Sequence, residues 1–272
     1  VVVDLVAYAN PSIYVQSPLD VVQLNFFENI TITNMCVKHG KRLIQYSTSE
    51  VYGKSGRDGA YNEDTSDLIM GPTSKQRWIY AAGKQFLERI LHAHGLRGDL
   101  DYTIIRPFNF VGPRFDYLVE AGTVGGPRVF AHFMSALITG GPMYLVDGGE
   151  QRRSFTHIDD ASDAFSILVA DPRASNQIYN IGNPETDMSI RELAALMTEL
   201  YEELTGAAPV NELIEISGED FYGKGYEDMD RVPPDISKLQ SLGWEPKRGK
   251  VQTFTEAIEY NLNPAVHASI LS

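Results

Sequence analysis

Apolar and polar positions along the chain follow two different periods, and together they predict an α/β fold. Short apolar runs at Val1–Ala9, Leu43–Ser47 and Tyr102–Arg106 are typical of buried parallel strands. Between these runs, apolar residues recur at helical spacing over about 19–39 and 77–94. The order strand, helix, strand, helix, strand predicts a parallel sheet with crossover helices.

The second half of the chain is predicted to mix further pieces of this sheet with a smaller lobe. Residues 10–18 read as a loop, and 209–230 read as irregular. Ser189 is a good N-cap, and Glu192 stands at the capping-box position of the helix that follows. The expected helices cover about 128–137, 159–170 and 189–203, with two short ones at the end, and the expected strands cover 143–146, 155–157 and 178–181.

Composition and charge narrow the classes of function. The chain has 272 residues, of which 43% are hydrophobic and 22% are charged, as in an ordinary globular enzyme. A net charge of −13 argues against nucleic acid or an anionic membrane surface as the main partner. Cys36 is the single cysteine, and it falls within an expected helix, so we expect a buried thiol and a cytoplasmic protein. Metal-ligand spacing is absent from the sequence, and no apolar run approaches about 18 residues.

One helix carries a candidate catalytic pair. Tyr80 and Lys84 are four residues apart, so they fall on one face of that helix. A cation beside a phenol favours the phenolate, which is a plausible base for a sugar hydroxyl. A second polar group, Thr48, Ser49 and Glu50, follows a predicted strand directly. Ligands bind at the carboxyl ends of parallel strands in such sheets, so we expect this group to lie in the site.

A set of motifs gives these residues a family context. They are Ser47-Thr48-Ser49-Glu50-Val51-Tyr52-Gly53, Gln76-Arg77-Trp78-Ile79-Tyr80-Ala81-Ala82-Gly83-Lys84, Arg106-Pro107-Phe108-Asn109, Val146-Asp147-Gly148-Gly149 with Gln151 and Arg153, Asn180-Ile181-Gly182-Asn183-Pro184, and Tyr222-Gly223-Lys224-Gly225-Tyr226. In this order the chain resembles the extended short-chain dehydrogenase/reductases. Within them it is most similar to the UDP-glucuronate decarboxylases, including the polymyxin-resistance decarboxylase domain and the UDP-apiose/UDP-xylose synthases.

The resemblance implies a fold, a cofactor and a reaction. The fold would be a Rossmann-like doubly wound parallel sheet with a smaller C-terminal substrate lobe. Residues 1–110 would be the C-terminal part of an NAD-binding domain, and 111–272 mainly a UDP-sugar lobe, with 155–182 returning to the main sheet. The expected reaction is NAD-dependent oxidative decarboxylation of UDP-glucuronate to a UDP-4-keto-pentose or UDP-xylose. The resemblance also implies a homodimer or larger assembly through the helices at about 19–39 and 77–94.

The resemblance assigns a role to each candidate residue. Tyr80 would take the C4 hydroxyl proton, Lys84 would lower the phenol pKa and hold the nicotinamide ribose, and Thr48 or Ser49 would share the proton. Glu50 and an arginine would serve the decarboxylation step. The other expected contacts are Leu5 and Ala7 with the cofactor, and Asn109, Arg128, Arg153 and Tyr226 with the substrate.

Three positions depart from the family pattern. Tyr144 stands where the relatives have a lysine that helps to hold the nucleotide, so this contact loses its charge. Ungapped, the relatives' catalytic arginine falls on Val232, and we assign its role to Arg231, one residue earlier. Ser49 stands where the apiose-forming relatives carry cysteine, which makes ring contraction to apiose less favoured.

The sequence also lacks a feature that the resemblance leads one to expect. The Gly-x-x-Gly-x-x-Gly turn that cradles the cofactor pyrophosphate is not in the 272 residues, and Val1–Ala9 matches the family's fourth strand. We therefore expect about 70 to 80 further residues upstream, the size of two to three strand–helix units. Without them the chain should bind NAD poorly.

Two other functions stay open at this point. One keeps the fold and changes the substrate, giving an epimerase or dehydratase that acts on another nucleotide sugar. The other is a non-catalytic binding protein built on the same fold. Normal turnover without Glu50 would favour the first, and failure of the full-length protein to bind NAD would favour the second.

Overall fold

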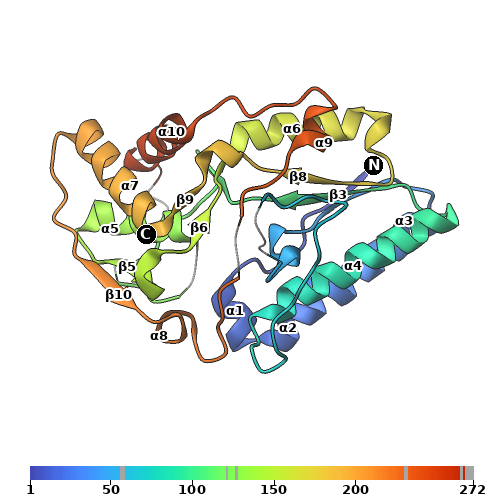
Figure 1. Ribbon diagram of the computed structural model, residues 1–272, viewed down its shortest axis with the longest axis horizontal. Coiled ribbons are helices and arrows are strands. Elements are labelled where there is room, and N and C mark those ends of the chain that lie inside the picture. Colours follow the sequence, from blue (N-terminus) through green and yellow to red (C-terminus); the bar gives the residue numbers. More distant parts are fainter. Residues whose placement is uncertain (56–58, 121, 126–127, 230–231, 264–265, 267–272) are drawn as a thin grey trace.

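A four-stranded parallel sheet forms the main layer of the molecule (Figure 1). The computed structural model describes residues 1–55, 59–120, 122–125, 128–229, 232–263 and 266. The strand order is β1-β2-β3-β8, so the strand late in the chain returns to lie beside β3. This confirms the predicted Rossmann-like α/β class. The strands are β1 (Val2–Asp4), β2 (Leu43–Tyr46), β3 (Tyr102–Pro107) and β8 (Gln177–Ile181).

Helices cover both faces of this sheet because successive strand residues point to opposite sides. On one face, Leu43 and Ile104 pack in a cluster with Cys36 of α3 (Asn29–Lys38) and Leu91 of α4 (Trp78–Arg97). On the other face, the neighbouring strand residues Ile44 and Ile105 pack with side chains of α6 (Ile158–Ala170) and α9 (Ser237–Gln240). Figure 1 shows α3 and α4 below the sheet and α6 and α9 above it. The buried position expected for Cys36 is confirmed.

The segment after β1 differs from the expectation. The expected strand to Ala9 ends at Asp4, and the expected loop contains a helix, α1 (Pro11–Gln16). Asn10 starts this helix, because its side chain accepts a hydrogen bond from the Ser12 amide. A proline at the first position supports the same start.

Asparagine side chains of the neighbouring helical segment hold the backbone of residues 6–8, which follow β1. The expected helix over 19–39 consists of α2 (Pro18–Val22), a π-helical turn η1 (Gln23–Glu28) and α3. The buried Asn25 side chain bonds both the amide and the carbonyl of Tyr8, at 2.7 and 2.9 Å. Asn29 donates to the Val6 carbonyl at 3.1 Å. Helix side chains therefore replace the hydrogen bonds that a neighbouring strand would supply.

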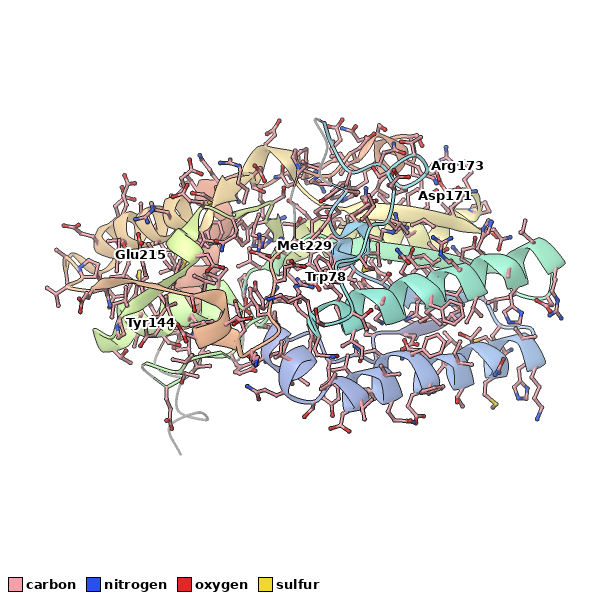
Figure 2. All side chains as sticks on the ribbon, turned by 60° about the horizontal axis from the view of Figure 1, so that its bottom comes forward. Trp78, Tyr144, Asp171, Arg173, Glu215 and Met229 are labelled. Atoms are coloured by element: carbon pink, nitrogen blue, oxygen red, sulfur yellow. The ribbon has the colours of Figure 1, made fainter. Side chains whose placement is uncertain are left out.

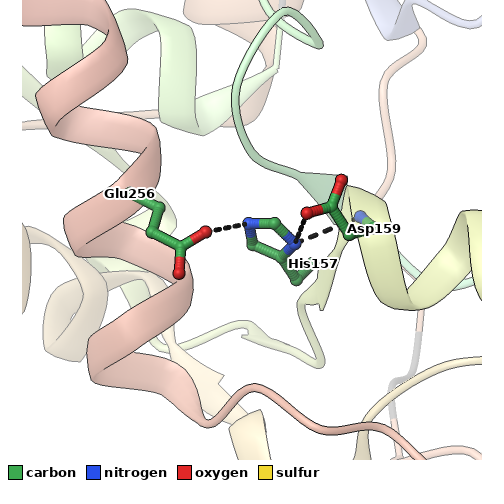
Figure 3. Close-up of side chains that lie close together, drawn as sticks. All are labelled: His157, Asp159 and Glu256. Atoms are coloured by element: carbon green, nitrogen blue, oxygen red, sulfur yellow. Dashed lines mark hydrogen bonds and ion pairs between the residues drawn. The ribbon is translucent and has the colours of Figure 1, made fainter.

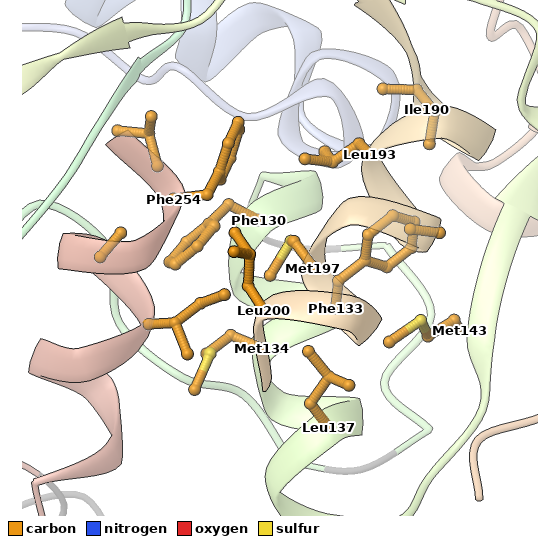
Figure 4. Close-up of a cluster of buried hydrophobic side chains, with 14 of the residues drawn as sticks. Phe130, Phe133, Met134, Leu137, Met143, Ile190, Leu193, Met197, Leu200 and Phe254 are labelled. Atoms are coloured by element: carbon orange, nitrogen blue, oxygen red, sulfur yellow. The ribbon is translucent and has the colours of Figure 1, made fainter. Parts of the chain in front are cut away.

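The smaller lobe is built around an apolar cluster (Figure 4). Phe130 and Phe133 come from α5 (Val129–Thr139), and Leu193 and Met197 come from α7 (Ile190–Thr205). Phe254 is contributed by α10 (Lys250–Leu262). The capping box predicted at the start of α7 is confirmed, since the side chains of its first turn bond each other's backbone amides.

The expectation of an irregular stretch over 209–230 was wrong. Strand β10 (Leu213–Ile216) pairs in parallel with β5 (Met143–Val146), and α8 (Gly218–Tyr222) follows it. The strand is hard to predict because it is short and alternates exposed with half-buried residues at a sheet edge. The remaining short elements are η2 (Ser49–Tyr52), β4 (Phe110–Val111), η3 (Asp147–Gly149), β6 (Arg152–Arg153), β7 (Thr156–His157), η4 (Pro172–Ala174), η5 (Pro184–Thr186) and β9 (Met188–Ser189).

A buried polar network fixes the end of β2 against α4. Arg106 and Glu88 form an ion pair at 2.7 Å and are 2% and 4% exposed. The Ser47 hydroxyl donates to Glu88 at 2.5 Å, and Arg106 donates to the Tyr52 hydroxyl at 2.9 Å. The network holds the backbone immediately before Thr48. No helix among the described residues is long and apolar enough to span a bilayer.

Candidate active site

The residues singled out from the sequence meet at two adjoining cavities. The tyrosine cavity, about 430 Å³, is lined among others by Leu5, Ala7, Thr48, Ser49, Glu50, Tyr80 and Lys84. The arginine cavity, about 140 Å³, is lined among others by Arg77, Arg153, Tyr144 and Tyr226. Ala9, Glu50, Asn109 and Arg128 line both cavities, so the two are continuous. Arg231 lies outside the described residues.

The end of β2 positions the polar group as expected. After Tyr46 the chain turns into η2, and the Thr48 hydroxyl oxygen caps this turn by accepting the Glu50 amide at 3.1 Å. Thr48, Ser49 and Glu50 therefore all face the tyrosine cavity from one rigid turn.

The Tyr80 hydroxyl lies in a chain of hydroxyl groups. Its ring stacks on Tyr14 at 4.5 Å, and its hydroxyl bonds both Tyr14 and Thr48. The sequence predicted a lowered phenol pKa, but the structure gives the opposite direction. Burial and the nearby charge of Glu50 raise the pKa of Tyr80 and outweigh the two hydrogen bonds, which act to lower it. Tyr14 was missed by sequence reasoning, because nothing local marks an aromatic residue in a short helix as a partner for Tyr80.

The Lys84 side chain is anchored to the backbone of β2. Its ammonium donates to the Tyr46 carbonyl at 3.0 Å and lies 3.4 Å from the Asn29 side-chain oxygen. Burial lowers the pKa of Lys84 to about 8. Its amine therefore lies at the floor of the tyrosine cavity as a positioned hydrogen-bond donor, 1% exposed.

Glu50 is fixed by an arginine that sequence reasoning did not assign to the site. Arg77 is 1% exposed and donates to Glu50 at 2.8 Å. Burial opposes its charge, but Glu50 outweighs this effect and raises the pKa of Arg77. The Arg77 guanidinium lies 5.2 Å from the centroid of the Trp78 ring, and one of its nitrogens lies 3.7 Å from the Met229 sulfur. Trp78 and Met229 belong to one apolar cluster and lie close together in Figure 2. Arg77 precedes Tyr80 by about one helical turn, and this spacing is the sequence pattern that could have indicated that Arg77 belongs to the site.

The other two arginines of the arginine cavity are also paired with carboxylates. Arg128 precedes α5 and contacts one oxygen of Asp116 through two nitrogens, at 2.7 and 3.1 Å. Arg153, in β6, donates to both oxygens of Asp228 at 3.1 and 3.2 Å. Neither carboxylate was predicted from the sequence.

Asn109 and Tyr226 lie where a substrate lobe would meet the sheet. Asn109 adopts a positive φ of 33°, which asparagine tolerates better than most residues, and donates to the Ser154 carbonyl at 3.0 Å. Tyr226 is 6% exposed and stacks on Tyr222 at 4.4 Å. Burial, with the charge of Asp228, raises the pKa of Tyr226 well above its usual range.

Aromatic side chains line the far end of the arginine cavity. The Tyr144 ring lies 5.8 Å from Phe221, and His132 lies 5.2 Å from the same ring. Tyr144 therefore supplies a ring at this end where the relatives supply a cation.

A separate polar cluster ties α6 to α10 (Figure 3). The His157 Nδ1 accepts the Asp159 amide at 3.1 Å, and its Nε2 lies 3.2 Å from Glu256. Arg248 already compensates these carboxylates, at 3.1 Å from Asp159 and 3.8 Å from Glu256. We therefore interpret the cluster as an ion-pair network that caps α6, because a guanidinium takes the place of a metal ion.

Comparison with known proteins decides the family. Residues 1–182 match the model of the NAD dependent epimerase/dehydratase family. The chain belongs to this family. The epimerase/dehydratase assignment agrees with the fold, the Tyr80 and Lys84 helix and the paired cavities.

Three known proteins show what the chain is similar to in sequence and in fold. The chain is 40% identical over 266 residues to a UDP-D-apiose/UDP-D-xylose synthase of Oryza sativa subsp. japonica, covering 90% of this chain and 66% of that protein. Its fold matches the crystal structure of the PbgP3 protein from Burkholderia pseudomallei with a TM-score of 0.83 and 36% identity, over 98% and 77% of the two chains. It also matches MoeE5 in complex with UDP-glucuronic acid and NAD, with a TM-score of 0.76 and 25% identity, over 96% and 79%. The chain thus spans about two thirds of the length of the rice relative.

NAD is the cofactor of this family, and the tyrosine cavity fits its reactive end. The buried Lys84 amine and the Tyr80 hydroxyl present donors at one wall, suited to ribose hydroxyls. Leu5 and Ala7 line another wall with small and apolar surface, suited to a nicotinamide ring.

Proposed function

We propose that the protein catalyses NAD-dependent oxidative decarboxylation of UDP-glucuronate, giving a UDP-4-keto-pentose or UDP-xylose. One observation carries the proposal. Glu50, paired with the buried Arg77, lies in the wall that joins the tyrosine cavity to the arginine cavity. A charged pair beside a proton-transfer tyrosine suits a substrate that carries a carboxylate next to the carbon being oxidised. The likeness to UDP-apiose/UDP-xylose synthases supports the same reaction.

In the first step, Tyr80 removes the proton from the C4 hydroxyl of the sugar. Bound NAD would supply the acceptor for the hydride from C4. Thr48 bonds the Tyr80 hydroxyl and passes the proton along the hydroxyl chain, while Ser49 lies beside it at the sugar. Lys84 orients the nicotinamide ribose through its amine. This step makes a 4-keto sugar, and its carboxylate is then β to the ketone.

In the second step, the bond between C5 and the carboxylate carbon breaks and CO₂ leaves. The electron pair of this bond stays on the sugar and forms an enolate over C5, C4 and the C4 oxygen. The enzyme must stabilise this oxyanion and return one proton to C5. Arg77 presents N–H donors beside Glu50, and Glu50 is the group that handles the proton. Arg231 remains our prediction for the arginine at the substrate carboxylate.

The arginine cavity would hold the nucleotide. Arg128 and Arg153 are suited to the diphosphate because guanidinium groups bind phosphate oxygens in pairs. Tyr226 and Asn109 would contact the sugar or the nucleotide from the same cavity. The aromatic end with Tyr144 suits a planar base.

The product is expected to be the UDP-4-keto-pentose or UDP-xylose rather than the ring-contracted, branched pentose apiose. Ring contraction requires a second carbon–carbon bond cleavage, and the apiose-forming relatives carry cysteine where this chain has Ser49. A serine hydroxyl is far less acidic than a thiol, so it cannot replace the thiol as an acid near neutral pH.

One assay tests the function. The full-length protein is mixed with UDP-glucuronate and NAD⁺, and CO₂ and NADH are followed together. Release of CO₂ supports the proposal, and its absence contradicts it. Accumulated NADH means that the 4-keto sugar leaves, whereas CO₂ without NADH means that the sugar is reduced again to UDP-xylose.

Replacing Glu50 with glutamine is expected to lower the rate of CO₂ release by about 100-fold, since a positioned proton-transfer group contributes about that much. The substitution keeps the side-chain size and removes the charge that Arg77 holds at 2.8 Å. Glu227→Gln is the matched control, because Glu227 pairs with Lys54 at 2.8 Å and does not line either cavity. Normal turnover of the Glu50 variant would favour an epimerase.

We also propose that the protein forms a homodimer through α4 and the helical segment made of α2, η1 and α3. Phe27 and Phe86 are 53% and 56% exposed, and Phe26 lies between them, at 5.4 and 5.3 Å from their rings. An exposed aromatic patch of this kind is typical of an interface. Phe86→Glu is expected to shift the protein from dimer to monomer in sedimentation, whereas the exposed Leu213→Glu in the smaller lobe should not. A wild-type monomer would contradict the proposal.

A further inference from the structure

Among the described residues, the arginines of the arginine cavity are each paired with a carboxylate before any ligand enters. The pairs are Arg77 with Glu50, Arg128 with Asp116 and Arg153 with Asp228. Tyr144 adds no positive charge. A UDP-sugar brings a diphosphate with two negative charges, and these would meet guanidinium groups that are already neutralised. One of the carboxylates therefore has to give way when the nucleotide binds.

Of these three carboxylates, Asp116 is the one that has a buried oxygen without a hydrogen bond from the described residues. Asp228 uses both oxygens on Arg153, and one of them also accepts the Met229 amide at 2.8 Å. Asp116 offers only one oxygen to Arg128. Its other oxygen accepts no hydrogen bond from the described residues. Water cannot readily supply one either, because the Asp116 side chain is only 5% exposed. A buried carboxylate oxygen without a donor costs free energy and is unusual in a folded protein.

The location of Asp116 connects this oxygen to the ligand. Asp116 lines the tyrosine cavity, and Arg128 lines both cavities, so their ion pair lies where the two join. A phosphate oxygen that binds the Arg128 guanidinium competes directly with Asp116. Asp116 would then be a buried anion beside a second anion, without its cation. A buried group in this position takes up a proton rather than remaining charged.

We propose that Asp116 is an internal counter-ion of Arg128 that is displaced by the diphosphate of the nucleotide and becomes protonated as the nucleotide binds. Once protonated, its hydroxyl donates a hydrogen bond to a phosphate oxygen, and the repulsion becomes an attraction. The proposal rests on the proposed function, since it requires a nucleoside diphosphate group at Arg128. In the free protein burial already raises the pKa of Asp116, although Arg128 acts against this.

Other groups that face the same space also titrate or carry charge. Lys84 has a pKa of about 8, so it changes charge in the same pH range. The proton uptake of Asp116 must therefore be isolated by substitution. The groups on the surrounding elements are Tyr14, Glu50, Tyr80, Lys84, Arg77, Arg128, His132, Arg153, Tyr144, Tyr222, Tyr226 and Asp228.

The test is calorimetric titration of the protein with UDP-glucose, whose diphosphate diester does not titrate near neutral pH. Binding heats are compared at about pH 7.5 in two buffers with different heats of ionisation, which gives the number of protons taken up. Wild-type protein is expected to take up close to one proton more than Asp116→Asn. Between about pH 6.5 and pH 8 its Kd should rise by up to about tenfold per pH unit, and the Asp116→Asn variant should bind more tightly at the upper end.

Asp228→Asn is the matched control, and it should keep the proton uptake of the wild-type protein. Equal proton uptake in wild type and Asp116→Asn overturns the proposal. Wild-type binding with the same heat in both buffers also overturns it, and this measurement does not depend on the variant folding. Both results leave the proposed function intact. Failure of wild-type protein to bind UDP-glucose overturns the counter-ion proposal and the proposed function together.

Discussion

Replacing Tyr80 with phenylalanine is expected to lower the rate of NADH formation from UDP-glucuronate by about 10³-fold, within the range that a positioned proton-transfer group contributes. The Tyr80 hydroxyl lies in the tyrosine cavity with hydrogen bonds to Thr48 and Tyr14. Phenylalanine keeps the ring stacked on Tyr14 and removes only the group that takes the C4 proton. Stopped-flow absorbance of NADH measures this step directly.

Binding of the nucleotide should survive the Tyr80 substitution. The nucleotide is proposed to bind in the arginine cavity, and Tyr80 does not line that cavity. The Kd for UDP-glucose is therefore expected to stay within about threefold of wild type. Tyr14→Phe is the matched control, since it removes one hydroxyl from the same stack and leaves the base in place, so its rate should fall far less. Loss of UDP-glucose binding in the Tyr80 variant would indicate a structural role.

The raised pKa of Tyr80 also bears on when the base is active. Burial and Glu50 keep the phenol protonated in the protein as it stands, so proton transfer to it needs a change in its surroundings. The positive charge of oxidised NAD and the proton path through Thr48 both act in that direction. Removal of the C4 proton is accordingly expected to require bound oxidised NAD.

The sequence predicted the parts of the site that are local in the chain. Thr48, Ser49 and Glu50 follow a strand directly, and strand ends of a parallel sheet converge, so their position followed from the hydrophobic pattern alone. Tyr80 and Lys84 followed from helical spacing in the same way, although the ammonium bonds the Tyr46 carbonyl instead of the phenol. That detail depends on the distance between α4 and β2, which no local pattern encodes.

The carboxylate partners of the arginines could not be predicted for the same reason. Asp228 lies 75 residues from Arg153 along the chain, and Asp116 stands 12 residues before Arg128. Neither pairing follows from a local pattern in the sequence. The sequence predicts arginines for a diphosphate site, but it does not predict that each of them is already paired with a carboxylate. The balance of charge in the cavity is a property of the tertiary structure.

The largest effect on stability is expected from Glu88→Gln, which should lower the free energy of unfolding by about 3 to 5 kcal/mol, as for other buried pairs that lose one partner. Arg106 is 2% exposed, and two of its nitrogens contact Glu88 at 2.7 and 3.1 Å. Burial opposes the charge of Arg106, but Glu88 outweighs it and raises the pKa of this guanidinium. Without the carboxylate the arginine stays charged, because its pKa lies far above neutral, and it is left buried beside a neutral amide.

Urea unfolding of wild type and variant measures this loss as a lower midpoint with an unchanged slope. Asp163→Asn is the matched control, since it removes an acid that pairs with Lys247 at 2.7 Å between two exposed side chains. Exposed pairs contribute little, so its midpoint should match wild type. The Glu88 network also bonds Ser47 directly before Thr48, so the destabilised variant should lose activity below its unfolding midpoint. A Glu88 variant with the same urea midpoint as the wild-type protein would contradict this prediction. It would show that the amide satisfies Arg106 as well as the carboxylate does, and that the network is not needed to hold the end of β2 at the site.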